Sequence, residues 1–223
     1  PETVDILRNS YKNDNSPSKI HVSDEINVRI LKVLSDLLGN RALFDQFVIS
    51  DGFSMLSNLM QSSNPSVAEL ALATTAKHLR KDIITIDLIK ALLVFNTYND
   101  NKIRNFALTT LFLVLDFQFE MLCTMPSFIY HLLCFVLKPL PLQSIEQLLQ
   151  VTAKFINKIT SFPVSVMSQL IWLQTNVPRQ FHSIAVNCLM SAVRLEEGRM
   201  CFPPEFWRYA QRDFASYKNL FKS

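Results

Sequence analysis

The stretch that most constrains the fold is residues 47–79, which read FVISDGFSMLSNLMQSSNPSVAELALATTAKHL. Apolar residues recur at helical spacing on both sides of a polar break, Ser62-Ser63-Asn64-Pro65. Gly52 precedes the first helical run, and the small residue Ala71 lies inside the second. This pattern predicts two helices that are joined by a short turn and pack against each other.

The same stretch resembles an armadillo repeat, a helical repeat related in architecture to the HEAT repeat. The resemblance rests on the turn glycine Gly52, on the Asn64-Pro65 pair that begins a third helix, and on Ala71 within that helix. A second match supports it, because placing Val67 on Ile103 also places Ala71 on Ala107. That common offset, from 67 to 103 and from 71 to 107, falls within the range of helical repeat units.

The resemblance implies an all-α fold: a right-handed armadillo-like α-solenoid of about four three-helix repeats, the first incomplete, with a C-terminal capping helix. A single three-helix unit cannot bury its apolar faces, whereas stacked neighbours form one continuous core. Outside residues 47–79, helices are expected near residues 24–38, 85–95, 102–115, 128–137, 144–160, 165–174 and 179–194.

Three segments are expected along the chain. Residues 1–23 form a polar, partly ordered lead-in, whose one apolar patch, Val4-Ile6-Leu7, could make a short helix. Residues 24–201 form the repeat domain, and residues 202–223 form the capping helix. Ser23 is the expected N-cap of the first helix, and Glu196-Glu197-Gly198 is expected to end the last repeat. The apolar residues of the first helix are expected to lie on one face, and they are Ile26, Ile30, Val33, Leu34, Leu37 and Leu38.

Composition agrees with a helical protein. The chain has 223 residues, 49% of them hydrophobic, and only three glycines, which are too few for the turns of an all-β or doubly wound fold. The net charge of +3 is small and dispersed, so charge alone implies no polyanionic partner. The most apolar zone, residues 106–137, is interrupted by Asp116, Glu120 and Pro126, so buried helices are expected there and no membrane span.

No catalytic site, metal site or cofactor is expected. The phosphate-loop, dinucleotide, nucleophile-elbow and zinc-protease motifs are absent. The four cysteines lack C-x-x-C spacing and lie in apolar surroundings, which indicates reduced thiols in an intracellular compartment. His131 with Cys134 is at most a fragment of a metal site. Cys188 is not expected to act as a nucleophile, because His182, the candidate base, lies off the helical face that carries Cys188.

In armadillo proteins that grip extended peptides, the third helices line a concave groove with an asparagine and, one turn earlier, a tryptophan. The asparagine positions correspond here to Asp36, Lys77, Leu113, Phe155 and Ser191, and the tryptophan positions to Lys32, Ala73, Thr109, Val151 and Asn187. None of the asparagine positions carries an asparagine and none of the tryptophan positions carries a tryptophan, so an importin-like peptide ladder is not expected. Leu113 and Phe155 would suit an apolar helix or a neighbouring domain, unless they belong to the core.

A basic cluster follows residue 76 and has two interpretations. Lys77, His78, Arg80 and Lys81 lie at the end of a predicted helix, where cations complement the helix dipole and cap the last carbonyls. Alternatively, they contact an acidic protein or a phosphate. The candidate partner-binding residues are therefore Lys32, Asp36, Lys77, Arg80, Leu113, Phe155, Asn187 and Ser191.

The predicted function is a non-catalytic scaffold or adaptor that binds a protein helix or domain within a larger intracellular assembly. Residues 195–199, with Pro203-Pro204 and the aromatic helix after them, resemble the ends of armadillo-like subunits of SWI/SNF-type chromatin remodelling complexes. This likeness favours the nucleus over the cytoplasm. Two alternatives stay open: a structural spacer, and a nucleic-acid-binding module that uses the basic residues of the C-terminal helix, Arg208, Arg212, Lys218 and Lys222.

Overall fold

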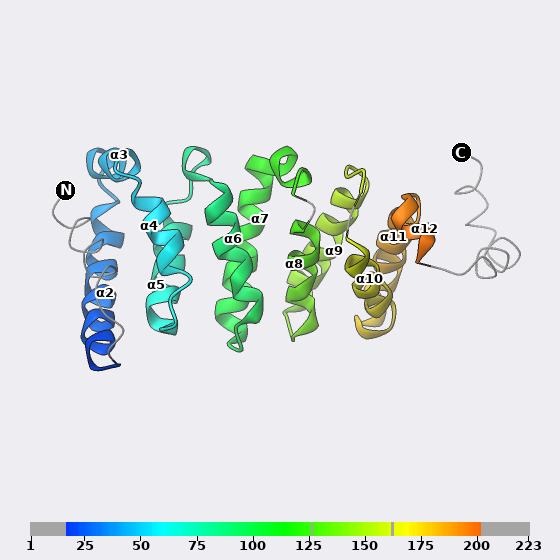
Figure 1. The fold of residues 1–223 in the computed structure, drawn as a ribbon, viewed down its shortest axis with the longest axis horizontal. Coiled ribbons are helices and arrows are strands. Elements are labelled where there is room, and N and C mark those ends of the chain that lie inside the picture. Colours follow the sequence, from blue (N-terminus) through cyan, green and yellow to red (C-terminus); the bar gives the residue numbers. More distant parts are fainter. Residues whose placement is uncertain (1–16, 126, 162, 202–223) are drawn as a thin grey trace, which may run out of the picture. The chain divides into compact units, whose positions relative to one another are not determined.

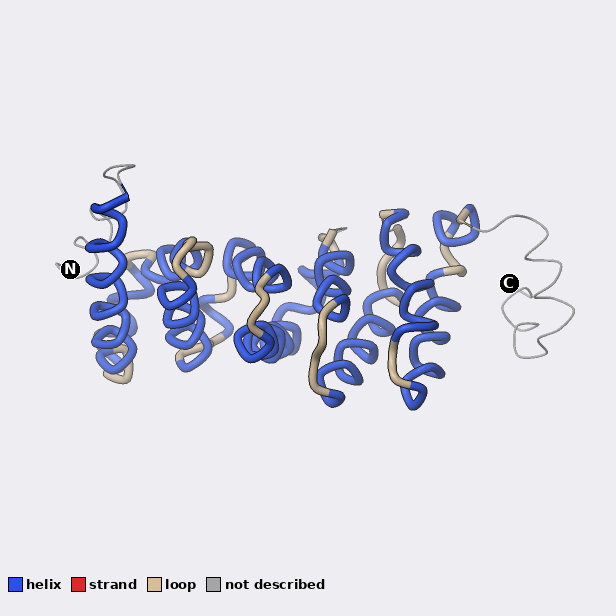
Figure 2. Tube along the Cα trace, turned by 90° about the horizontal axis from the view of Figure 1, so that it is seen from below, coloured by secondary structure: helices blue, strands red, loops and turns tan. Residues whose placement is uncertain are grey.

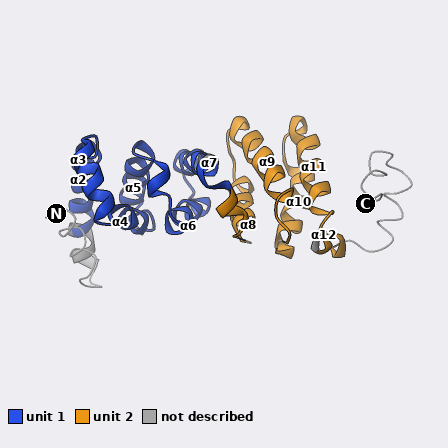
Figure 3. Ribbon diagram, turned by 90° about the horizontal axis from the view of Figure 1, so that it is seen from above, with its two compact units in different colours: residues 1–119 blue, residues 120–223 orange. Residues whose placement is uncertain are grey.

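A computed structural model describes residues 17–125, 127–161 and 163–201 (Figure 1). Within these ranges every regular element is an α-helix or a short 3₁₀ helix (Figure 2), which confirms the predicted all-α class. The chain divides into two compact units, Pro1–Phe119 and Glu120–Ser223 (Figure 3). Most of the predicted lead-in and the predicted capping helix at 202–223 lie outside the described residues.

Unit 1 is built from helices in two layers. Its elements are α2 (Pro17–Leu37), α3 (Arg41–Ile49), α4 (Gly52–Leu59), α5 (Pro65–Lys77), η1 (Lys81–Ile83), α6 (Ile86–Val94), η2 (Phe95–Thr97) and the first part of α7 (Asn101–Cys123). Helix α2 packs against α5, and α4 packs against α3, α5 and α6. In Figure 3, α2, α5 and α7 lie on one side of unit 1, and α4 and α6 lie on the other.

The turn between α3 and α4 needs a glycine for reasons of space. A Cβ atom at Gly52 would collide with the Phe47 ring, which packs edge-on against Phe53 with ring centroids 5.2 Å apart. The left-handed conformation in this turn belongs to the preceding residue, Asp51 (φ 58°). Gly52 therefore allows α3 and α4 to approach closely, and the expected turn glycine is confirmed at this position.

The Asn64-Pro65 pair begins α5 as expected. The Asn64 side-chain oxygen accepts a hydrogen bond from the Ser66 amide at 2.9 Å. Pro65 occupies the first turn, where its missing N–H would have no helical partner and its fixed φ already suits a helix. Ala71 is fully buried on α5, as expected for a small residue at a close helix contact.

Helix α2 begins earlier than expected, at Pro17 rather than at Asp24. Ser23 lies in the helix interior, so the prediction that it is the N-cap is wrong. The Ser16-Pro17-Ser18 sequence suggested a turn, but proline is equally well suited to the first turn of a helix. The predicted boundary at residue 23 therefore falls inside α2.

The buried face of α2 also differs from the expected one. Asn27, Leu31, Leu34 and Leu38 are buried, whereas Ile26, Val33 and Leu37 are exposed. The prediction placed all the apolar residues on one face, but a helix rotates by about 100° per residue. Residues 26 and 27, or 33 and 34, therefore point in different directions, and only one set packs on α5.

Unit 2 also arranges its helices in two layers. Its elements are the end of α7, α8 (Phe128–Cys134), η3 (Phe135–Leu137), α9 (Leu142–Ile156), α10 (Val164–Asn176), η4 (Arg179–Phe181), α11 (His182–Ala192) and α12 (Glu196–Met200). Helix α8 packs against α9 and α10, α11 packs against α9 and α10, and α12 contacts α10. Alternate helices therefore pack side by side in the same layer, α8 beside α10 and α9 beside α11.

The residues expected to end the last repeat instead form α12, since Glu196-Glu197-Gly198 opens that short helix. A Cβ atom at Gly198 would collide with the carbonyl of Ala192, so α12 lies directly against the end of α11. The Arg199 guanidinium donates to the carbonyls of Val193 (3.3 Å) and Arg194 (2.7 Å). The chain therefore turns at residues 193–195, three residues before the glycine.

No single helix of the described residues is long and apolar enough to cross a membrane, although the two parts of α7, Asn101–Leu115 and Phe117–Cys123, meet the length and composition criteria when taken together as a bent pair.

Candidate protein-interaction surfaces

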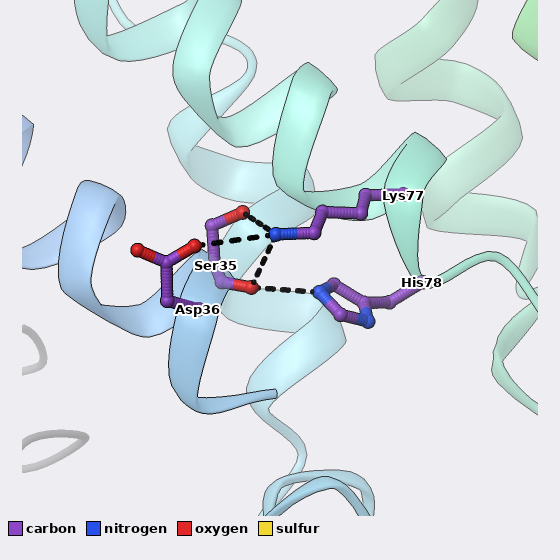
Figure 4. A network of polar contacts seen from close by, with 4 residues as sticks. All are labelled: Ser35, Asp36, Lys77 and His78. Carbon is purple, nitrogen blue, oxygen red and sulfur yellow. Dashed lines mark hydrogen bonds and ion pairs between the residues drawn. The ribbon is translucent and has the colours of Figure 1, made fainter. Parts of the chain in front are cut away.

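The carboxyl end of α2 is completed by side chains from α5 (Figure 4). Three of the last four carbonyls of α2 accept bonds from the backbone amides of Leu38, Gly39 and Asn40. The remaining carbonyl, that of Ser35, accepts from Lys77 Nζ at 3.1 Å and lies 2.9 Å from His78 Nε2. Every terminal carbonyl of α2 therefore has a partner, which an α-helix end otherwise lacks.

This contact corrects one interpretation of the basic cluster. Lys77 and His78 bond the end of the neighbouring helix α2 rather than the last carbonyls of their own helix. Lys77 Nζ also lies 3.3 Å from Asp36 Oδ1, in an exposed ion pair of the kind that contributes little to stability. Two of the predicted partner-binding residues, Asp36 and Lys77, thus bind each other.

A second contact joins the N-cap of α5 to the interior of α2, seven residues after Pro17. The Asn64 amide nitrogen donates to Asp24 Oδ2 at 3.0 Å. The polar contacts between α2 and α5 therefore link residues 40 to 43 positions apart in the chain, at both ends of α5. Helices α2 and α5 run in the same direction, and residues about 41 positions apart occupy corresponding places.

Arg80 is held within unit 1. Its guanidinium carbon lies 4.6 Å from the centroid of the Phe44 ring, and its nitrogens lie 3.1 Å from Asp82 Oδ2 and 3.9 Å from Asp45 Oδ1. A cation over an aromatic face is stabilised by the ring quadrupole. Arg80 therefore fastens the segment after α5 to α3, and binding a partner through it would require giving up these contacts.

Helices α2, α5 and α7 present corresponding faces that are not buried, which we call the ladder face. Corresponding residues of the ladder face are 41 positions apart between α2 and α5 and 36 positions apart between α5 and α7. Leu70 and Ala73 are half-buried and the other members are exposed. The ladder face consists of Glu25, Arg29, Lys32 and Asp36 on α2, Ser66, Leu70, Ala73 and Lys77 on α5, and Lys102, Phe106, Thr109 and Leu113 on α7.

The α7 part of the ladder face is its most apolar part. Phe106 is 39% exposed and Leu113 is 51% exposed, with Thr109 between them and Lys102 one turn before Phe106. Seven residues are close to two helical turns, so the two apolar side chains lie on the same side of the helix. Sequence reasoning identified Leu113 and missed Phe106, although their spacing of seven residues was a usable signal.

Phe155 does not belong to a groove. It is 1% exposed, and its ring packs against Phe128 with centroids 5.0 Å apart. The prediction that Phe155 meets a partner is therefore wrong, and the alternative that it belongs to the core holds. The exposed residues of α9 include Gln143, Gln147, Gln150 and Lys154, the last of which directly precedes Phe155.

The remaining predicted residues of unit 2 lie on α11, where Asn187 is exposed and Ser191 is half-buried. The exposed residues of α9 are Leu142 in the first turn and then Gln143, Glu146, Gln147, Gln150 and Lys154, and those of α11 are Ser183 and Asn187. Apart from Leu142 this surface is polar, in contrast to Phe106 and Leu113 on α7.

The cysteine with the most strongly shifted pKa is buried on α11. The Cys188 thiol donates a hydrogen bond to the carbonyl of Leu149 at 3.3 Å, and burial raises its pKa to about 12. His182 lies 3.0 Å from the carbonyl of Val177 through Nε2. A nucleophilic cysteine needs a thiolate, and this environment favours the thiol. Among the described residues no three His, Cys, Asp or Glu side chains gather to hold a metal ion.

Cys188 is therefore expected to resist thiol reagents in the native protein at neutral pH. The label should enter Cys188 only when the chain unfolds, as mass spectrometry of labelled peptides with and without denaturant would show. In the unfolded chain the thiol ionises near its ordinary value of 9.0, whereas the native thiol keeps its proton. The difference in the pKa of Cys188 between the folded and unfolded states therefore destabilises the folded state as the pH rises above about 9. Rapid labelling of the native protein would contradict this assignment.

No family model matches the chain, and no curated protein matches it. The chain is similar to the crystal structure of an engineered protein, a target of the Northeast Structural Genomics Consortium, at 12% sequence identity and a TM-score of 0.45. The match covers 97% of this chain and 91% of the engineered one. At this score the likeness carries no conclusion about function.

Proposed function

We propose that this protein is a non-catalytic scaffold or adaptor that binds another protein through the ladder face of unit 1. The observation that carries the proposal is the pair Phe106 and Leu113, two partly exposed apolar side chains on one side of α7. Single exposed apolar residues are normal on protein surfaces, but two at this spacing match the anchors of an amphipathic helix.

The surroundings of these anchors suit a protein interface. Protein interfaces have an apolar centre and a polar rim, and here the exposed Lys102 on α7 supplies positive charge beside the apolar pair, whereas Lys77 on α5 is paired with Asp36. Full burial of a Phe or Leu side chain contributes about 1.5–3 kcal/mol, and the part already covered reduces that gain. The partner is accordingly an amphipathic helix with two apolar anchors and an acidic residue near Lys102.

The proposal includes an armadillo-like architecture. Its support within unit 1 is the short α3, the glycine turn into α4 and the capped α5, in the order that the armadillo resemblance implies. In each unit alternate helices are layer neighbours, as α4 is to α6 and α9 is to α11. A right-handed solenoid of about four repeats within a larger intracellular, preferably nuclear and chromatin-associated, assembly is the proposed setting.

The test compares proteins that copurify with the full-length protein from its own cells at moderate and high salt. An apolar interface responds weakly to salt, whereas binding through phosphates weakens steeply. We expect stoichiometric companions to persist at high salt and to be reduced at least tenfold by the double variant Phe106→Ser, Leu113→Ser. The matched control is Ile49→Ser, which changes a side chain on α3 that is 85% exposed.

Three outcomes would contradict the proposal. Companions retained by the double variant would place the interface elsewhere. Nucleic acid that is removed by salt would favour the nucleic-acid alternative and the basic residues 208–222. If no companion copurifies under any condition, the result favours the structural spacer. In that case substitutions on α7 change the stability of the protein or have no effect.

A further inference from the structure

The contact between α8 and α10 in unit 2 joins a cysteine to a buried amide. Gln169 Nε2 on α10 donates a hydrogen bond to Cys134 Sγ at the end of α8, at a distance of 3.1 Å. Gln169 is 8% exposed, whereas Cys134 is half-buried. The two residues lie 35 positions apart in the chain, so only the packing of the two helices brings them together.

The other polar atom of this amide is unpaired. Gln169 Oε1 is buried, and no group of the described residues hydrogen-bonds to it. Because Oε1 and Nε2 belong to one planar amide, Oε1 also lies close to the Cys134 sulfur. A buried acceptor without a partner costs free energy, and such groups are few in native proteins. The amide therefore offers Cys134 an acceptor that the thiol does not use.

A cysteine that carries one additional oxygen would use both atoms of the amide. In the thiol form the sulfur pairs with Gln169 Nε2 alone. In a sulfenic acid, S–O–H, the sulfur can still accept from Nε2, and the new hydroxyl can donate to Oε1. Oxidation of Cys134 by one step would thus complete the hydrogen bonds of Gln169 and add a second bond between α8 and α10.

Two hydrogen bonds to the Cys134 sulfur also favour the form that reacts. Peroxides oxidise the thiolate rather than the thiol. Burial raises the pKa of the Cys134 thiol, and the hydrogen bonds from Gln169 and Tyr130 act in the opposite direction. Donors aimed at the sulfur stabilise its negative charge.

Two other cysteines provide a comparison within the same protein. Cys188 is fully buried and donates to a backbone carbonyl. Cys123 is half-buried like Cys134, but burial and the Glu120 carboxylate both raise the pKa of its thiol, with Lys158 acting in the opposite direction. A carboxylate near the sulfur disfavours the thiolate. Of these three cysteines, Cys134 therefore combines partial exposure with donors to its sulfur.

We propose that Cys134 is a site of reversible oxidation, at which a hydroperoxide converts the thiol to a sulfenic acid held by the Gln169 amide. The thiolate attacks one peroxide oxygen, so that an S–O bond forms and the O–O bond breaks. With hydrogen peroxide the leaving hydroxide takes up the proton that the thiol lost and becomes water. Sulfur is oxidised and the peroxide is reduced. Two equivalents of a small thiol reverse the step, since they become a disulfide and the added oxygen leaves as water.

Hydrogen peroxide and dimedone, which traps sulfenic acids, test the proposal in the full chain. The dimedone adduct at each cysteine is measured by mass spectrometry, with fragment spectra that separate Cys134 from Cys123. We expect the adduct at Cys134 to exceed that at Cys123 at least fivefold. Gln169→Met, which removes both amide atoms, should lower the Cys134 adduct about fivefold, the effect of one hydrogen bond.

Gln174→Met is the matched control, because it makes the same change on the same helix. Gln174 Nε2 bonds the carbonyl of Leu170 in its own helix, so this variant should leave the Cys134 adduct unchanged. Circular dichroism checks that both variants are folded, and the comparison of Cys134 with Cys123 in the parent needs no variant.

Three results would each overturn the proposal. If Cys134 gives no adduct in the native parent, it is not an oxidation site. If Cys134 and Cys123 are trapped equally, exposure alone governs oxidation. If folded Gln169→Met gives as much Cys134 adduct as the parent, the amide does not stabilise the oxidised cysteine.

Discussion

Replacing Phe155 by alanine is expected to destabilise unit 2 by about 3–5 kcal/mol. The side chain is 1% exposed and its ring stacks at a tilt on Phe128, with centroids 5.0 Å apart. Truncation would remove the apolar surface buried on folding and leave a cavity beside Phe128, which the rigid helices can fill only in part. Denaturant unfolding followed by fluorescence or circular dichroism measures the change.

The neighbouring residue provides the control. Lys154 is exposed on the same helix, so Lys154→Ala is expected to change the free energy of unfolding by no more than about 0.5 kcal/mol. This pair of variants separates the core role of Phe155 from the partner-binding role that the sequence suggested. If Phe155→Ala unfolds like the parent, the packing described for α9 is incorrect.

Replacing Ala107 by leucine is expected to destabilise unit 1 by about 1–3 kcal/mol. Ala107 is fully buried on α7, and so is the corresponding Ala71 on α5. A larger side chain at this position has no space, so α7 would have to shift or adopt strained rotamers. Thermal or denaturant unfolding of the variant measures the loss.

Thr109→Leu is the matched control, because Thr109 lies two residues away on the exposed side of α7. It adds a leucine to the same helix without overpacking a core, and leucine has a higher helix propensity than threonine. The expected change is therefore small or slightly stabilising. If Ala107→Leu melts like the parent, the assignment of Ala107 to the core is wrong.

Local signals along the chain predicted much of the fold. The polar breaks and the helical spacing of apolar residues located the described helices to within a few residues, apart from the early start of α2, the continuation of α7 to Cys123 and the addition of α12. Gly52 and Asn64-Pro65 act where they were expected to act. These features depend on neighbouring residues, through caps, turn sterics and helical periodicity, and a single sequence contains all of that information.

The sequence was less informative about which side of a helix is buried. On α2 it offered two apolar sets one residue apart, and the packing of α5 selected Leu31, Leu34 and Leu38. On α9 a shift of one residue exchanged the exposed Lys154 for the buried Phe155. Periodicity alone cannot distinguish adjacent rotations of a helix when both carry apolar residues.

The sequence by itself thus determined an all-α chain with its helices, breaks and turn residues, because these follow from local sterics and hydrogen bonding. Only the tertiary structure decided that Lys77 and His78 bond the end of α2 and that Phe106 joins Leu113 on an exposed face. It also left Ile26, Val33 and Leu37 exposed on α2. These outcomes depend on contacts between residues about 40 positions apart, whose geometry exists only once the helices have packed.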